Sequence, residues 1–349
     1  MLTTPGGVAW ASGGGNPPID RTAATDVVWV AVGPEHVGVV TTEVEAPRLR
    51  AEGPIAALGW PVVAVPWWDS DAFVGAAAKM LDAAPSLLGG DGHRGFGHDL
   101  THSLVTARMR LSAADVAQMR RLGADAAAAV EGALAQWRPG EMDHSVAARI
   151  AAAVETCGAT APVLLVGGDD RLRRFRHPVA VGRPMSDVVM AVLVAARAGL
   201  HVALTRYAGR AAALDELAEP LGRARRIHAR TLAACRAGVE VGAVLDTLAA
   251  GYQSAGVPDG WRQHYQGGPI AYGQREFEIA PVQRDSEWWG LRLERDVAVA
   301  WNPSLPGGAK DEDTYLVGDG EPALLTTTGA WPTVDCDGLA RPDALRIDS

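Results

Sequence analysis

The sequence contains little cysteine and almost no lysine. Its three cysteines, Cys157, Cys235 and Cys336, are spread widely over 349 residues and form no Cys-x-x-Cys pair. This spacing excludes a disulfide framework and a cysteine-based zinc knuckle, and it favours a reducing compartment. Only two of the 32 basic residues are lysines, Lys79 and Lys310.

Long apolar runs and basic tracts are also missing. No stretch approaches the roughly 20 apolar residues that a membrane-spanning helix needs, and the N-terminal sequence MLTTPGGVAW has no basic start followed by an apolar run. The formal net charge is -9, whereas affinity for nucleic acid depends largely on Lys and Arg that neutralise phosphates. We therefore expect a cytoplasmic protein that binds neither membranes nor nucleic acid.

Tryptophan, in contrast, is abundant. The chain has 11 Trp against four Phe and five Tyr, and several stand in pairs, such as Trp67 and Trp68. Large aromatic side chains usually fill cores and interfaces. Some of them could instead line a substrate pocket, and composition alone leaves both uses open.

Short β-type runs separated by turn residues characterise the first part of the chain. Valine-rich runs bounded by Gly, Pro and Asp predict strands in VAWASGG, DVVWVAVG, HVGVVTTEVEAPRL and PVVAVPWW. Two helices are expected to follow, around 69–82 and 99–109. Residues 1–110 are therefore predicted to form a small α/β domain.

Longer helices begin the second part. Ser112 is a plausible N-cap for an Ala-rich helix that ends before Pro139 and Gly140. A helix over 142–157, strands in APVLLVGG and DVVMAVLVAARAGLHVALTRY, a helix pair over 214–256 and a Gly-rich β-type finish are expected after it. Residues 111–349 are thus predicted to form a larger α+β domain, which makes the whole chain α+β.

Candidate chemistry is concentrated in four segments of the second domain. Each combines His, Asp, Glu or Arg with Gly or Pro: GGDDRLRRFRHP (167–178), AGLHVALTRY (198–207), WRQHYQGGPIAYGQRE (261–276) and AWNPSLPGGAKDEDTYLV (300–317). A single histidine is weak evidence for catalysis. Four such segments in this order are stronger evidence.

The order of these pieces resembles the creatinase/aminopeptidase P family. The shared pattern is two N-capped helices ending in PGE, an RHP segment, a strand ending in LTR, an H-x-x-GG segment and a final ED-T-x-LV strand, over about 112–317. The resemblance implies the "pita-bread" fold for the second domain. It also implies that the first domain is the family's smaller N-terminal domain.

Metallopeptidases of this family hold two metal ions with two Asp, one His and two Glu. The two Asp positions correspond to Val192 and Ala203, the His to His264, and the Glu positions to Asn302 and Glu312. Three of the five ligands are therefore absent, and bridging carboxylates are what hold two divalent ions close together. We expect no metal and no other cofactor, although His264, Glu312 and His201 could still hold a single ion.

Creatinase, a family member that cleaves a C–N bond without metal, is the better precedent. The resemblance places a proton-transferring histidine at His177, within FRHP. An imidazole can take and return a proton near neutral pH. His177 is therefore the predicted general acid and base, with His264 and Glu312 as further catalytic residues.

The remaining candidates are predicted to bind substrate. Arg206 and Arg275 suit a carboxylate, because a guanidinium offers two parallel hydrogen bonds. Glu276 and Asn302 suit amide or amine groups. The other predicted contacts are Tyr272, Trp301 and His201.

Three functions are compatible with this pattern. The leading hypothesis is a metal-independent enzyme, hydrolase or lyase, that cleaves a C–N bond in a small amino-acid-like or amide substrate. A metallopeptidase of the Xaa-Pro type with a rebuilt metal site is the second. The third is a non-catalytic protein that binds a small molecule or short peptide. The resemblance also implies a homodimer, with Trp67 and Trp68 as candidate contacts.

Overall fold

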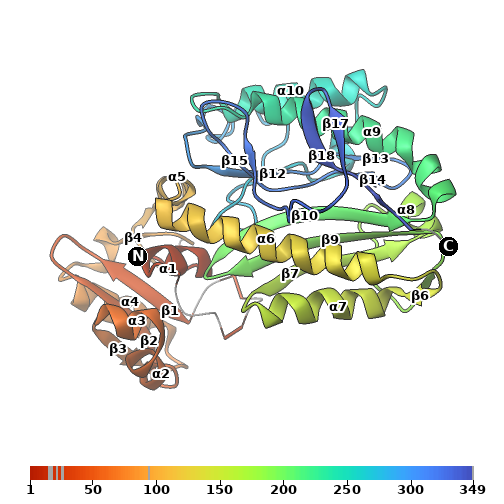
Figure 1. The fold of residues 1–349 in the computed structure, drawn as a ribbon. Coiled ribbons are helices and arrows are strands. Elements are labelled where there is room, and N and C mark those ends of the chain that lie inside the picture. Colours follow the sequence, from red (N-terminus) through yellow and green to blue (C-terminus); the bar gives the residue numbers. More distant parts are fainter. Residues whose placement is uncertain (15–18, 21–22, 25–26, 93–94, 348–349) are drawn as a thin grey trace. The chain divides into compact units, whose positions relative to one another are not determined.

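The computed structural model describes residues 1–14, 19–20, 23–24, 27–92 and 95–347. The chain divides into two compact units, Met1–Met109 with Ala198–Leu200, and Arg110–Arg197 with His201–Ser349. Figure 1 shows the order of the elements along the chain. None of the helices in the described ranges is long and apolar enough to cross a membrane.

The first unit contains a three-stranded sheet in the order β1-β2-β3. Strand β2 pairs antiparallel with β1 and parallel with β3. The ring of Trp29 packs against Phe73 and Phe96, with ring centroids 4.9 and 5.8 Å apart. The elements are α1 (Pro5–Ala11), β1 (Val28–Val32), β2 (Val37–Thr42), α2 (Ala46–Ala51), α3 (Gly53–Leu58), β3 (Val62–Val65), α4 (Ser70–Met80), η1 (Pro85–Leu87), β4 (Gly89–Gly90), β5 (His98–Asp99) and α5 (Thr101–Met109).

One predicted strand is wrong. VAWASGG was expected to be β-type, but most of it lies in helix α1 or in the turn that follows. The Thr4 side chain accepts a hydrogen bond from the Gly7 N–H at 3.1 Å, and Pro5 occupies the first turn. Thr at the N-cap and Pro at the first helical position are start signals that outweigh the β-propensity of a single Val and Trp. The expected strand at 26–33 is confirmed as β1, although residue 26 lies outside the described residues.

The second unit is built on a four-stranded sheet in the order β19-β10-β9-β7. Strands β9 and β10 are buried along most of their length, as expected where both faces of a sheet are covered. Helices α6 and α7 run along this sheet in Figure 1. Its elements in chain order from α6 to β10 are α6 (Ala113–Gln136), β6 (Glu141–Met142), α7 (Asp143–Thr156), β7 (Thr160–Gly168), α8 (Asp170–Arg174), β8 (Pro184–Met185), β9 (Val188–Arg197) and β10 (Leu200–Gly209).

A second sheet, in the order β11-β12-β15-β16, carries the C-terminal motifs. Helices α9 and α10 pack against each other, and α9 also contacts β12, β13 and β14. The elements are α9 (Ala211–Ala234), α10 (Val241–Ser254), η2 (Gly260–Gln263), β11 (Gly267–Pro269), β12 (Ala298–Trp301), β13 (Ser304–Leu305), β14 (Ala309–Lys310), β15 (Tyr315–Leu316), β16 (Ala323–Leu324), β17 (Thr333–Cys336), β18 (Leu339–Pro342) and β19 (Leu345–Arg346).

Most predicted helices are confirmed. Helix α6 begins with a capping box in which Ser112 and Asp115 satisfy each other's backbone N–H groups. The expected helix at 142–157 is α7, and the expected pair at 214–256 is α9 and α10. The mixture of helices and sheets confirms the α+β class.

Candidate active site

Two histidines from distant parts of the sequence meet in the second unit. His177 lies in the loop after α8, and His264 directly follows η2. Their Nε2 atoms are 3.1 Å apart, which is hydrogen-bond distance. His264 is buried, whereas His177 is exposed. The loop histidine is thus the one that a ligand can reach directly.

Both histidines line a cavity of about 650 Å³. This volume is within the usual range for a small-molecule site. The rest of its wall combines the apolar run Ile279–Val282 with aromatic and polar side chains. Among them are Arg176, Trp261, Tyr265, Gln266 and Glu278.

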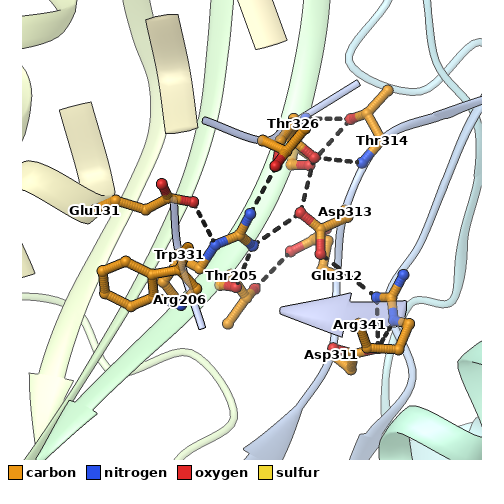
Figure 2. Close-up of polar contacts among 12 residues, drawn as sticks. Glu131, Thr205, Arg206, Asp311, Glu312, Asp313, Thr314, Thr326, Trp331 and Arg341 are labelled. Atoms are coloured by element: carbon orange, nitrogen blue, oxygen red, sulfur yellow. Dashed lines mark hydrogen bonds and ion pairs between the residues drawn. The ribbon is translucent and has the colours of Figure 1, made fainter. Parts of the chain in front are cut away.

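A buried lysine and glutamate lie close to the histidine pair. The Lys310 Nζ is 2.9 Å from Glu312 Oε2, and the two side chains are 4% and 6% exposed. Glu312 also accepts hydrogen bonds from the Thr205 hydroxyl and from the Asn302 Nδ2, each at 3.1 Å. Figure 2 shows the bond between Thr205 and Glu312. Three side chains of the protein, Lys310, Thr205 and Asn302, thus donate to this carboxylate.

These charges set the protonation of the site. Burial, reinforced by the Lys310 charge, lowers the pKa of His264 to about 2 and moves the pKa of His177 below its ordinary value. Burial alone would raise the pKa of Glu312, but the Lys310 ammonium and its hydrogen bonds hold it below the ordinary value. The site therefore contains two neutral imidazoles beside an ammonium–carboxylate pair at neutral pH.

The segment around Ala203 and the segment around Glu312, which correspond to metal-ligand positions of the metallopeptidases, lie side by side. The Ala203 N–H donates to Thr314 Oγ1 at 2.7 Å, and the Thr205 N–H donates to the Glu312 carbonyl oxygen at 2.9 Å. Ala203 on β10 and Val192 on β9 offer no side-chain donor. Among the described residues, no three His, Cys, Asp or Glu side chains are grouped so that they could hold a metal ion.

A dinuclear metal site does not fit these side chains. Two divalent ions need several carboxylates around them. Here Glu312 is the one carboxylate at the corresponding positions, and its charge is already balanced by Lys310. The side chains at these positions therefore do not form a dinuclear carboxylate site.

Arg206 lies in a different environment from the one predicted. It is 1% exposed, and its guanidinium contacts Glu131 at 3.1 Å and Asp313 at 2.8 Å. Further donors reach the carbonyl oxygens of Thr205 and Thr326, as Figure 2 shows. This arginine is therefore committed to a buried ion network and not directed at a substrate carboxylate.

Trp301 is also placed differently from the prediction. It is fully buried on β12, and its indole N–H donates to the Cys235 sulfur at 3.2 Å. It is not among the residues that line the cavity of about 650 Å³. Its ring is core packing behind the site, whereas its neighbour Asn302 contacts Glu312.

Tyr272, Glu276 and His201 are not among the residues that line the cavity of about 650 Å³. The Tyr272 hydroxyl donates to Asp115 at 2.7 Å, and Glu276 accepts from the Gly273 N–H at 2.9 Å. His201 Nδ1 is 3.1 Å from the carbonyl oxygen of Ala271. All three side chains therefore have protein partners, and only the bond between Glu276 and Gly273 is local in the sequence.

Arg275 forms an ion pair with Glu278, which lines the cavity. Its guanidinium also lies 5.3 Å from the centre of the Tyr265 ring. Both contacts hold Arg275 at the cavity wall. Of the predicted substrate contacts, Arg275 and Asn302 are therefore the ones with direct contacts to residues of the site.

Two residues of the site are absent from the sequence prediction. Lys310 could have been singled out, because it is one of only two lysines and stands two positions before Glu312. Arg176 directly precedes His177; it bonds Ser304 and Gln263, and it has no carboxylate partner within the described ranges. Several arginines stand close together in RLRRFRH, and the sequence alone does not show which of them faces the cavity.

The fold is that of Xaa-Pro peptidases. Prolidase from Pyrococcus furiosus superposes with a TM-score of 0.72 at 17% identity, covering 94% of this chain and 95% of that one. Dipeptidase PepE from Mycobacterium ulcerans gives 0.68 at 20% identity, covering 93% and 88%. X-Pro aminopeptidase from Thermotoga maritima gives 0.67 at 16% identity, covering 88% and 89%.

The resemblance seen in the sequence is therefore confirmed at the level of the fold. The chain has the pita-bread architecture along nearly its whole length. Neither a protein-family model nor the sequence of a curated protein matches this chain. The chemistry has to be argued from the residues of the site.

Proposed function

We propose that this protein is a metal-independent hydrolase that cleaves a C–N bond in a small amino-acid-like or amide substrate. The observation that supports this proposal is the 3.1 Å contact between His177 and His264 at the wall of a cavity. The peptidase-like fold supports a hydrolytic reaction. In this proposal, two neutral histidines and the Lys310–Glu312 ion pair do the work that metal ions and their carboxylate ligands do in a metallopeptidase.

His177 is the proposed general acid and base. When its Nε2–H donates to His264 Nε2, the Nδ1 lone pair of His177 is not used by that bond. This nitrogen takes a proton from water while the water oxygen bonds to the substrate carbon. The same proton then passes to the leaving nitrogen as the C–N bond breaks, which restores the neutral imidazole.

His264 and Lys310 stabilise the intermediate charges in this scheme. A hydrogen bond to neutral His264 supports the imidazolium that forms on His177. The Lys310 ammonium lies close enough to affect both histidines electrostatically. Because Lys310 is 4% exposed, is paired with Glu312 and does not line the cavity, we assign it an indirect electrostatic role without contact to the substrate.

Arg176 gives the cavity a positive side beside the proposed base. Its guanidinium contacts the neutral oxygens of Ser304 and Gln263 and so retains its net charge. A substrate with a carboxylate near the scissile bond suits this arrangement. The same proton transfers would also serve an elimination, and analysis of the products distinguishes the two.

The test is turnover with and without chelator. Dipeptides with and without C-terminal proline, N-acyl amino acids and creatine would be screened for release of an amine. We expect activity to survive exhaustive chelation and His177→Ala to lower kcat/KM by about 10²–10⁴-fold. His36→Ala, which removes an exposed histidine of the first unit, is the matched control.

Other outcomes identify the alternatives. Loss of activity on chelation with recovery on adding one divalent ion would show a metallopeptidase with a rebuilt site. Ligand binding without turnover, unchanged in a His177→Ala/Glu312→Gln variant, would show a binding protein. The N-terminal domain of FACT complex subunit SPT16 from chickpea also has this fold, with a TM-score of 0.62 at 11% identity.

A further inference from the structure

The Lys310 ammonium contacts Glu312, the single carboxylate that remains at the positions corresponding to the metal ligands of the metallopeptidases. Lys310 is one of two lysines in the chain, and it is 4% exposed, whereas Lys79 is exposed. Lysine is among the residues least often buried, because taking its charge out of water is costly. A buried lysine in so lysine-poor a sequence calls for a specific partner, and Glu312 at 2.9 Å is that partner.

The backbone holds Lys310 in place. Its N–H donates to the Tyr207 hydroxyl at 2.9 Å, and the same hydroxyl lies 3.1 Å from the Lys310 carbonyl oxygen. Lys310 also pairs with Ser304 in the β13–β14 hairpin. The ammonium therefore extends toward Glu312 from a fixed point and is not a mobile surface charge.

The ammonium contacts a carboxylate whose other partners also carry oxygen atoms, the kind of atom that binds hard cations. Glu312 supplies a carboxylate, and Thr205 and Asn302 contact that carboxylate. The Asn302 Oδ1 is buried and has no hydrogen-bond partner within the described ranges. Next to this group, Ala203 and Val192 offer no donors, so one positive charge balances the one carboxylate.

We infer that Lys310 is a built-in cation that excludes divalent metal ions from the position beside Glu312. Two facts carry this inference. First, the Lys310 ammonium is already paired with the Glu312 carboxylate, which a metal ion would need as a ligand. Second, a divalent ion beside Glu312 would lie within a few ångströms of this fixed positive charge. Repulsion of that kind in a buried site is large compared with the affinity of a single carboxylate.

This inference goes beyond the proposed function, from which it takes only the identity of the site. It predicts that the position becomes a metal site when the lysine is removed. Lys310→Ala would leave room for an ion together with the Glu312 carboxylate and the Asn302 oxygen. The readout is metal binding, which needs no substrate.

The experiment titrates Co²⁺ into protein purified without a metal-affinity column, followed by calorimetry and by the visible absorption of ligated Co²⁺. We expect wild type and Lys79→Ala, the other lysine, to bind Co²⁺ weakly and alike. Lys310→Ala should bind about one ion, at least about 100-fold more tightly. Lys310→Ala/Glu312→Gln should lose this gain, because it removes the carboxylate together with the ammonium.

Lys310→Ala leaves a buried carboxylate unpaired, which could impair folding. In that case Co²⁺ should restore the fold and raise its melting temperature, whereas the charge-balanced double variant should fold without metal. Wild type that binds Co²⁺ as tightly as Lys310→Ala would overturn the inference, and so would a folded Lys310→Ala protein with no gain. Chelator-resistant turnover by the wild-type protein would leave the proposed function standing in either case.

Discussion

At the scale of single residues, the site depends on a histidine, His264, that burial keeps uncharged. His264 is buried beside His177 and close to the Lys310 charge. Both effects disfavour a second positive charge, so the ring remains neutral in the folded protein. The neutral form is also the one that can accept a hydrogen bond from His177.

This state predicts a pH dependence of stability. The pKa of His264 is about 2 in the folded protein and about 6.5 in an unfolded chain. Below pH 6.5 the unfolded chain binds a proton that the folded protein does not, so the free energy of unfolding falls as pH falls. The slope from this histidine is at most about 1.4 kcal/mol per pH unit.

Urea unfolding of wild type and His264→Asn between about pH 7 and about pH 5, a range that spans the ordinary histidine pKa of about 6.5, measures this slope. We expect the variant to lose less stability than wild type on acidification. His36→Asn, at an exposed position, should behave as wild type does. Parallel pH profiles for wild type and His264→Asn would contradict the assignment.

At the scale of elements, helix α6 combines strong local signals with a close tertiary contact. Its capping box fixes the start, whereas its glycines differ in what surrounds them. A Cβ at Gly123 would lie 2.3 Å from the Leu325 carbonyl oxygen, but a Cβ at Gly132 would meet nothing within 4 Å. The first glycine lets the chain near β16 approach the helix, and the second has no such role.

The two glycines predict opposite effects of the same substitution. Gly132→Ala should raise the free energy of unfolding by about 0.5–1 kcal/mol, because alanine favours a helix. Gly123→Ala should lower it by about 1–3 kcal/mol, because backbone atoms have to move apart. Chemical denaturation of both variants provides the comparison, and a stabilised Gly123→Ala protein would show that the contact is not tight.

At the scale of the whole molecule, Trp67 and Trp68 are large apolar side chains that water reaches. They are 67% and 68% exposed, and their rings pack edge to face with centroids 5.7 Å apart. Exposed aromatic pairs of this kind are enriched at protein interfaces. The homodimer suggested by the resemblance therefore has a candidate contact in the first unit.

We expect the protein to sediment as a dimer in analytical ultracentrifugation. A Trp67→Ser/Trp68→Ser variant should shift toward monomer, since it removes the two largest exposed apolar groups of this segment. Trp331→Phe, in the second unit, serves as a control that also removes an indole. A wild-type monomer at high concentration would remove both the dimer and the proposed contact.

The local pattern of residues predicted much of the fold. N-caps, helical periodicity and valine-rich runs located α4, α5, α6, α7 and the hairpin of β9 and β10, because these signals act between residues close in sequence. The order of motifs predicted the pita-bread fold. The exception, α1, shows that a short run of mixed propensity is decided by its N-cap and proline.

The partners of the buried charges could not be read from the sequence. Lys310 and Glu312 are neighbours in sequence, but His177 and His264 are separated by 87 positions and Arg206 and Glu131 by 75. Which arginine faces the cavity and which is buried depends on the register and packing of the sheets. For that reason the prediction directed Arg206 and Trp301 toward substrate, while both lie in the core.

The sequence by itself determined the class of fold, the loss of carboxylates at Val192 and Ala203, and the presence of His177, His264 and Glu312. These follow from residue identity and local order. Only the tertiary structure decided that the two histidines touch, that Arg176 lies beside them and that Lys310 neutralises Glu312. Such contacts depend on burial and distance, which exist only after distant strands and loops have packed together.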